Sequence, residues 1–307
     1  MEFQQLKGFL AVARHQSFSK AAVTTFRTQP AISLQIQSLE HELGVQLFDR
    51  LGGRKVMLTD EGKIFFDLVS PLVVDYDSLT IRFHEMRGQE LEGMVRIATH
   101  TSVMVYLLPE IIKAFKKKHP DCELSIVNRS REDILKMVQD GEVDIGITSL
   151  KAVPDSINYT VFAEFKRLLI GPKTHLLARK PQVSLSDIAA YPLLLSPKGS
   201  NTREIVDQVF HAHGLAYKLA MEATGRLAVK EYVGLGLGIS IINAFYIAKE
   251  DTKKFFIKDM SRLFGVAQRA VITRKKRYLS KKAREFIDLI IARRNNVVAD
   301  PIGQEGT

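Results

Sequence analysis

An apolar stripe at helical spacing is the feature that most restricts how this chain can fold. Its members follow one another at intervals of three or four residues: Phe65, Leu68, Leu72, Tyr76, Leu79, Phe83 and Met86. The near-heptad spacing predicts one helix from Asp60 to about Arg87, roughly 40 Å long at about 1.5 Å per residue. A single helix cannot bury such a stripe, so a second copy of the chain is the simplest partner. Pro71 is expected to kink or interrupt the helix, because it removes one backbone hydrogen bond.

Three short helices and a hairpin are predicted before the long helix. Apolar residues recur at helical spacing from Phe3 to Ala13, and Ser17 is a suitable cap for a second helix. Thr28 can cap a third helix, which has Pro30 in its first turn and Gly44 at its end. The pair Gly52-Gly53 then turns the chain into a short strand that ends at Thr59. Residues 1–59 therefore predict an all-α winged helix-turn-helix, and residues 60–88 a linker helix.

In a helix-turn-helix, the second helix of the pair enters the major groove and presents polar side chains to bases and phosphates. Glutamine can form a bidentate pair with adenine, and arginine and hydroxyl groups suit backbone phosphates. The candidate DNA contacts are Gln29, Pro30, Ser33 and Gln35 on the third helix and Arg50, Arg54 and Thr59 at the wing. The competing interpretation is a small structural core without a DNA role. The local charge favours it mildly, because residues 1–92 hold 10 Lys and Arg against 12 Asp and Glu, although the whole chain carries +10.

After residue 88 the pattern alternates between apolar strands and amphipathic helices, which predicts an α/β module with a parallel sheet over residues 89–307. The expected helices include one from Val103 to Lys118, and the expected strands include one from Val161 to Ile170. The tail from Asn295 to Thr307 has the composition of a disordered segment. No run is long and apolar enough for a membrane span, and the N-terminus has no secretory signal, so a cytoplasmic protein without a membrane partner is expected.

Catalytic, metal and nucleotide sites are not predicted. Cys122 is the single cysteine, which excludes an internal disulfide, and no histidine or asparagine motif marks it as a nucleophile. His211 and His213 would point to different sides of a helix, so no metal is expected. The glycines at 234, 236 and 238 follow a helix and precede a strand, which is the reverse of a dinucleotide-binding turn. The chain is therefore expected not to be an enzyme and to carry no cofactor.

Two hydroxyl-rich segments stand where helices begin. The first is Thr99-His100-Thr101-Ser102, and the second is Ser200-Asn201-Thr202. Free backbone N–H groups and the positive end of the helix dipole favour anions at such positions, and hydroxyls add further donors. Ordinary helix capping is the competing explanation. Two such termini in two subdomains could face one cleft, so we predict a small anionic ligand, with Ser200 among its contacts.

The N-terminal residues closely resemble the signature of LysR-type transcriptional regulators. The match covers Phe18-Ser19-Lys20-Ala21-Ala22, Gln29 to Ile36, Leu39-Glu40, Leu43-Gly44, Leu47 to Arg50 and Leu58-Thr59. The resemblance implies a homodimer or homotetramer that binds double-stranded promoter DNA, with RNA polymerase as a possible further partner. It also implies an effector module like a periplasmic binding protein. Its subdomain I would cover about 93–163 and 268–294, and its subdomain II about 164–267.

A narrower resemblance is to the CysB-type branch, which regulates sulfur assimilation and cysteine biosynthesis. It rests on Ile97 to Thr101, on Thr224 and on Val229 to Gly238. Effectors of that branch include sulfate-like anions and acetylated serine, and the resemblance would place Thr99, Thr101, Ser102, Thr148 and Thr202 around the effector. Ser102 stands where the branch usually has a longer amide side chain. The alternatives are a LysR-type regulator of another pathway with an organic-acid effector, and a cytoplasmic solute-binding protein.

Overall fold

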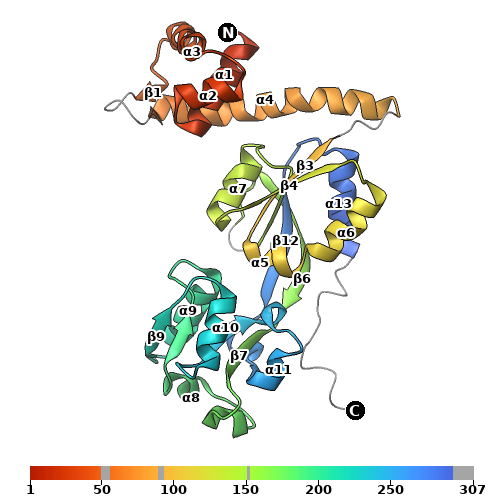
Figure 1. Ribbon diagram of the computed structural model, residues 1–307. Helices are drawn as coiled ribbons and strands as arrows, with labels where there is room; N and C mark the ends of the chain where they lie inside the picture. The colour runs from red at the N-terminus through yellow and green to blue at the C-terminus, as the bar shows by residue number, and fades with distance from the viewer. Residues whose placement is uncertain (50–55, 89–92, 151–152, 293–307) are drawn as a thin grey trace.

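The computed structural model describes residues 1–49, 56–88, 93–150 and 153–292. The predicted phosphate contacts Arg50 and Arg54 and the predicted disordered tail 295–307 lie outside these ranges. Figure 1 shows the N-terminal helices on one side of a long helix and two stacked α/β subdomains on its other side. Within the described residues, no helix combines the length and the apolar character that a membrane span requires.

The N-terminal head consists of three helices and a two-stranded hairpin. Its elements are α1 (Phe3–His15), α2 (Phe18–Thr24), α3 (Gln29–Leu43), β1 (Phe48–Asp49) and β2 (Met57–Leu58). The Ser17 side chain accepts a hydrogen bond from the backbone of Lys20, and Thr28 accepts one from Ala31, so the predicted caps start α2 and α3. One continuous core forms beneath them, built mainly from Leu6, Phe9, Leu10, Ile32, Ile36, Leu39 and Leu47.

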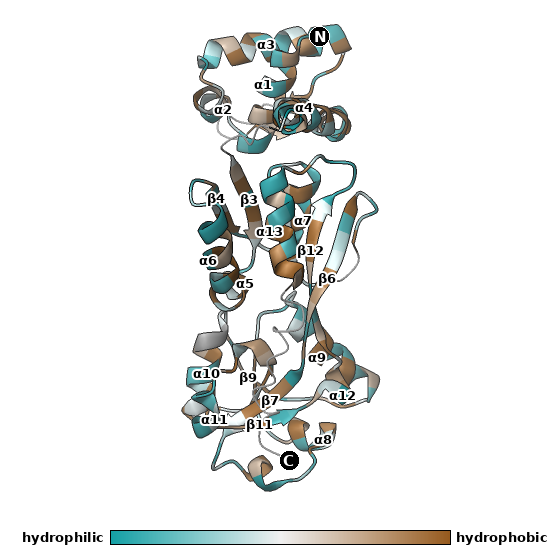
Figure 2. Ribbon diagram, turned by 90° about the vertical axis from the view of Figure 1, so that its right-hand side faces the viewer, coloured by the Kyte–Doolittle hydropathy of each residue, from teal (hydrophilic) through white to brown (hydrophobic). Residues whose placement is uncertain are grey.

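Helix α4 (Asp60–Met86) runs without a break through Pro71, so the predicted interruption is wrong. Proline removes one backbone hydrogen bond, but the flanking turns are held by packing, since Val69, Ser70 and Val73 are buried. Gly62 permits the close approach of α4 to the head, because a Cβ there would lie 2.1 Å from the carbonyl oxygen of Leu47. Figure 2 views α4 nearly end-on, between the head and the α/β module.

Subdomain I is a five-stranded mixed sheet in the order β4-β3-β5-β12-β6. Strand β3 pairs in parallel with β4 and β5, whereas β12 pairs antiparallel with both β5 and β6. The predicted parallel sheet is confirmed for β4, β3 and β5 and is wrong for β12, which comes back from the second subdomain and joins the sheet from the opposite end. The strands are β3 (Met94–Thr99), β4 (Glu123–Asn128), β5 (Ile145–Thr148), β6 (Ile157–Phe165) and β12 (Ala267–Arg274).

Helices cover both faces of this sheet, and two apolar clusters divide the core accordingly. The helices are α5 (Thr101–Tyr106), α6 (Pro109–Lys118), α7 (Arg131–Gln139) and α13 (Lys281–Ala292). The single helix predicted over 103–118 is thus two helices. Pro109 occupies the first turn of α6, and since its ring nitrogen has no N–H, α5 ends before it.

Subdomain II contains an antiparallel sheet in the order β10-β7-β11 and a parallel pair β8-β9. Its strands are β7 (Arg167–Pro172), β8 (Leu193–Leu195), β9 (Leu219–Glu222), β10 (Ser240–Asn243) and β11 (Phe255–Asp259). Its helices are η1 (Leu176–Arg179), α8 (Leu185–Ala189), α9 (Asn201–Ala212), α10 (Arg226–Gly234), η2 (Ala244–Tyr246), α11 (Asp251–Lys254) and α12 (Ser261–Phe264).

The chain crosses between the two subdomains at Lys166 and again at residues 265–266. The strand predicted from 161 to 170 is therefore divided into β6 and β7. Arg167 joins the two crossings, because its guanidinium donates to the carbonyl oxygens of Phe264 at 2.7 Å and Val266 at 3.3 Å. Burial, together with the nearby charge of Arg269, lowers the pKa of Arg167 to about 10. This arginine therefore stays charged at neutral pH while it ties the crossing strands together.

The turn after α7 docks subdomain I onto the head and α4. Asp140 contributes its carbonyl oxygen, which accepts hydrogen bonds from Arg14 and from Ser70, each at 2.9 Å. Arg14 also forms an ion pair with Glu142 at 3.3 Å. A second contact lies at the end of α4, where Glu85 accepts hydrogen bonds from the Tyr278 hydroxyl at 2.5 Å and the Lys281 backbone at 2.7 Å. Helix α4 is thus attached to both the head and the α/β module.

Candidate functional site

Two surfaces correspond to the predicted sites. The first is the open side of α3, which is the side opposite its buried residues Ile32, Ile36 and Leu39. Gln29 and Pro30 are exposed at the start of this helix, and Ser33 is half-buried one turn later. The Ser19 hydroxyl donates to the side-chain oxygen of Gln29 at 2.9 Å, which fixes the glutamine at the α2–α3 corner. These three residues lie where a recognition helix would present them to a groove.

The other two described candidates of this region make contacts within the head. The Gln35 side chain turns toward α1, since its Oε1 lies 2.9 Å from the position that a Cβ on Gly8 would take. The Thr59 hydroxyl accepts from the backbone of Gly62 at 2.9 Å and donates to the carbonyl of Gln46 at 2.7 Å, so it caps α4. Gln35 therefore lies away from the open side of α3, and the Thr59 hydroxyl is occupied by its cap.

The second surface is a cleft between the two subdomains, with a cavity of about 340 Å³. Three helix N-termini open onto it: those of α5, α7 and α9. Among the predicted residues, Ser102, Ser200 and Thr202 line the cavity directly. The remaining lining residues are His100, Ser130, Arg131, Glu132, Ser149, Gly199, Asn201, Glu204, Asn243, Tyr246 and Arg269.

Three other predicted effector residues lie near the cleft without lining it. Thr99 and Thr148 are fully buried beneath it, with exposed fractions of 0% and 1%. Thr99 donates to the carbonyl of Ile147 at 2.8 Å, and the Thr148 hydroxyl lies 3.0 Å from Nε2 of His100. Thr101 is exposed, and its backbone N–H donates to the Asn128 side chain at 3.0 Å. Thr99 and Thr148 thus support the wall that carries His100, and Thr101 is not among the residues that line the cavity.

Histidine 100 is a neutral hydrogen-bonding group at neutral pH. Burial lowers its pKa to about 4, and the positive charge of Arg269 acts in the same direction. Arg269 is itself buried, with an exposed fraction of 7%. The cleft therefore presents a buried guanidinium, a neutral imidazole and several hydroxyls, which are groups that bind an anion by donating hydrogen bonds.

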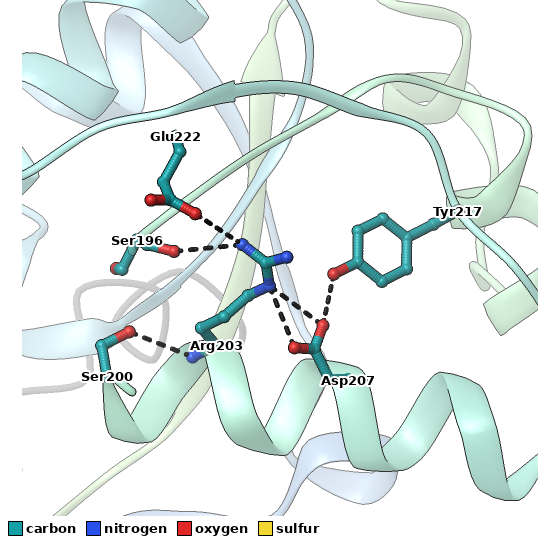
Figure 3. A network of polar contacts seen from close by, with 6 residues as sticks. All are labelled: Ser196, Ser200, Arg203, Asp207, Tyr217 and Glu222. Carbon is teal, nitrogen blue, oxygen red and sulfur yellow. Dashed lines mark hydrogen bonds and ion pairs between the residues drawn. The ribbon is translucent and has the colours of Figure 1, made fainter. Parts of the chain in front are cut away.

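A network of polar contacts fixes the N-terminus of α9 (Figure 3). The buried Arg203 guanidinium pairs with Asp207 at 3.0 Å and Glu222 at 3.2 Å, and it donates to the Ser196 carbonyl at 3.4 Å. Its backbone N–H donates to the Ser200 hydroxyl at 3.4 Å. Tyr217 donates to Asp207, and burial together with that hydrogen bond raises the pKa of Tyr217 to about 12. The first turn of α9 is thereby held rigid beside the cleft.

Sequence reasoning missed several residues of the cleft. Arg269 lies on β12, Asn243 and Tyr246 come from β10 and η2, and Ser130 caps α7. The side-chain oxygen of Asn243 is buried and makes no hydrogen bond to any described residue. No short motif connects these positions, because they meet only after the chain has crossed twice between sheets. Among the described residues, no group of three or more His, Cys, Asp or Glu side chains could hold a metal ion.

Comparison with known proteins places both surfaces in one family. Residues 3–63 match the bacterial regulatory helix-turn-helix proteins of the LysR family, and residues 88–295 match the LysR substrate binding domain. The regulator CysB of Burkholderia cenocepacia is 30% identical over 283 residues, which cover 91% of this chain and 90% of that protein. The RuBisCO operon transcriptional regulator of Allochromatium vinosum is 28% identical over 293 residues, covering 95% and 96%.

A solved structure agrees with this assignment. The crystal structure of the cofactor-binding domain of the Cbl transcriptional regulator superposes with a TM-score of 0.61 at 26% identity. The match covers 66% of this chain and 89% of that domain. The two matched segments together account for both the head and the α/β module, and the relatives are regulators rather than enzymes. This chain therefore belongs to the LysR family of DNA-binding transcriptional regulators.

Proposed function

We propose that the chain regulates genes of sulfur or cysteine metabolism, and that its effector is a small anion or an acetylated serine bound in the inter-subdomain cleft. The observation that carries this proposal is the convergence of the α5 and α9 N-termini, with Ser102, Ser200 and Thr202, on a cavity that also contains Arg269. The CysB relative and the CysB-like motif support the sulfur assignment. The relative that regulates a RuBisCO operon supports the alternative that this chain acts in another pathway; in that alternative the effector is an organic acid.

The site can bind both a negative group and a hydrogen-bond donor. The serine and threonine hydroxyls and the helix N-termini suit the negative group. Asn243, which is only 4% exposed, has a carboxamide oxygen without a hydrogen bond to the described residues, and Glu132 also lines the cavity. An acetylated amino acid offers an N–H or a hydroxyl in addition to its carboxylate, whereas sulfate offers acceptors only. A ligand panel can therefore distinguish the two effector classes.

Helix α7 gives the effector a route to the head. Ser130, Arg131 and Glu132 at its start line the cleft, and the turn after its end contacts Arg14 and Ser70 through Asp140. Nine residues of helix rise about 13 Å, so one rigid element spans the distance from the effector to the DNA-binding unit. Closure of the subdomains on a ligand would move α7 and thereby change the orientation of the heads.

The proposed effector contacts predict a selective loss of ligand binding. Thr202→Ala should leave the affinity for DNA unchanged but lower the affinity for the effector, because only the α9 terminus is altered. In thermal-shift titrations of the full chain, a ligand at about 100 times its Kd should stabilise the native protein by about 2.7 kcal/mol. The panel would contain sulfate, thiosulfate, O-acetylserine, N-acetylserine and benzoate.

A pair of cap variants separates ligand binding from capping. Ser200 caps α9 and Ser184 caps α8 through equivalent hydrogen bonds, but only Ser200 lines the cleft. Both alanine variants should lose about 1 kcal/mol of unfolding free energy, and only Ser200→Ala should also lose the ligand shift. Equal ligand-induced shifts in the two variants would show that Ser200 acts only as a helix cap. For Thr202→Ala, a wild-type effector affinity measured by calorimetry would refute the proposed site.

The DNA contacts predict a second loss. Gln29→Ala and Ser33→Ala should each weaken specific DNA binding by about 1–3 kcal/mol if a base contact is removed. His41→Ala, an exposed position at the far end of α3, is the matched control and should bind like the wild type. Anisotropy titrations at fixed salt measure the three variants, and wild-type affinity in the first two would remove α3 from the contact surface.

A further inference from the structure

The open side of α3 carries one large apolar side chain among its polar ones. Leu34 is 66% exposed, although Ile32, Ile36 and Leu39 on the same helix are completely buried. Successive helix residues are about 100° apart, so the buried side chains place Leu34 near the middle of the opposite face. Its neighbours on that face, about one turn before and after it, are Pro30, Gln37 and Ser38, which are all exposed. Leu34 therefore lies at the centre of the exposed face of α3 and shares that face with Pro30, one of the proposed DNA contacts.

The major groove offers an apolar partner of one kind. Its base edges consist of hydrogen-bond donors and acceptors except for the 5-methyl group of thymine, which aliphatic and aromatic side chains contact. A leucine held against polar base edges would displace their water without offering a hydrogen bond in return, which costs free energy. Contact between leucine and a thymine methyl group buries apolar surface on both partners, which is favourable. The exposed Val23 and Phe26 lie on α2 and in the turn before α3, outside this face.

We infer that Leu34 contacts the 5-methyl group of a thymine in each half-site and thereby selects thymine at that position. The inference rests on the proposed insertion of α3 into the major groove. It adds a contact that depends on one methyl group and on no hydrogen bond. Substitution of deoxyuridine for thymidine removes this methyl group and leaves every base-pairing and groove hydrogen bond in place.

The test is a cycle between protein and DNA variants. The full-length chain first selects its binding sites from a random pool of duplexes, and each thymidine of the selected half-site is then replaced singly by deoxyuridine. For the wild type, we expect one position at which the replacement weakens binding about 3- to 10-fold. Leu34→Ala should bind the unmodified duplex with a similar loss and should be insensitive to the replacement at that position.

Two further variants complete the design. Leu34→Met keeps an apolar side chain of similar size and should retain the sensitivity to deoxyuridine. Leu43→Ala removes a leucine that is 37% exposed at the last turn of the same helix, and it should behave as the wild type.

The outcomes separate this inference from the proposed function. If Gln29→Ala and Ser33→Ala weaken binding but Leu34→Ala keeps the full methyl sensitivity, the Leu34 contact is wrong and the α3 surface stands. The Leu34 contact is also wrong, and the α3 surface also stands, if no thymidine of the selected half-site can be replaced by deoxyuridine with a loss of affinity. If Gln29→Ala and Ser33→Ala both bind like the wild type, the placement of α3 fails, and the Leu34 contact fails with it.

Discussion

A chain with glutamate at both Leu72 and Leu79 is expected to be monomeric and to bind a two-half-site operator at least about 100-fold more weakly than the wild type. These residues belong to an exposed stripe on α4, in which Leu68, Leu72, Leu79 and Phe83 are 55–62% exposed. Full burial of a leucine stabilises an interface by about 1.5–3 kcal/mol. In a symmetric dimer each leucine occurs once in each subunit, so each substitution removes two such contributions. Buried carboxylates would oppose association further, and the loss of paired heads removes one of two simultaneous half-site contacts.

Thr80→Glu is the control for this effect. Thr80 is exposed on α4, but it lies about 100° around the helix from Leu79 and outside the stripe. It should remain a dimer or tetramer and bind DNA normally. Sedimentation velocity gives the mass of each variant, and anisotropy gives its affinity for DNA. A double glutamate variant that keeps the wild-type mass would show that another surface joins the subunits.

Gly141→Ala is expected to abolish most of the change in DNA affinity that the effector causes, while the protein still binds both DNA and the effector. Gly141 has φ of +70° in the turn that docks on α4, and a Cβ there would lie 2.3 Å from a methyl carbon of Val74. The turn must therefore move away from α4, which breaks the contacts of Asp140 with Arg14 and Ser70. An effector-induced change of about 5-fold or more in DNA affinity should fall to about 1-fold.

Gly214→Ala controls for backbone strain. Gly214 has φ of +63° after α9, and a Cβ there would meet nothing within 4 Å. Both alanines incur the left-handed penalty of about 1–2 kcal/mol, but only Gly141→Ala also displaces the turn. Thermal unfolding measures the stability of both variants, and Gly141→Ala should be the less stable because it also displaces the turn. A wild-type response in Gly141→Ala would show that the signal does not pass through the α7 turn.

The local elements could be predicted wherever one sequence signal determines them. Thr28 and Pro30 start α3 as expected, and the apolar stripe gives the length of α4 closely. The predictions fail where a local feature and its surroundings have opposite effects. Pro71 leaves α4 intact because its neighbours are buried, and Pro109 ends α5 although the apolar pattern continues past it.

The cleft was only partly predictable. Ser102, Ser200 and Thr202 carry a local signal, since each stands at a helix start. Arg269 and Asn243 carry none, because they lie on β12 and β10 and reach the cavity through the antiparallel return of the chain between the two sheets. Long-range strand order determines their position, and no local pattern in the sequence records it.

The most direct test of regulation through the cleft is the affinity of the full-length chain for a selected operator, measured with and without each anion of the panel at constant ionic strength. Constant ionic strength is essential, because phosphate contacts make DNA affinity depend strongly on salt. We expect at least one anion to change the Kd for DNA about 5-fold or more in the wild type and to leave it unchanged in Thr202→Ala. An anion that changes the affinity equally in both proteins would contradict the cleft as the site of regulation.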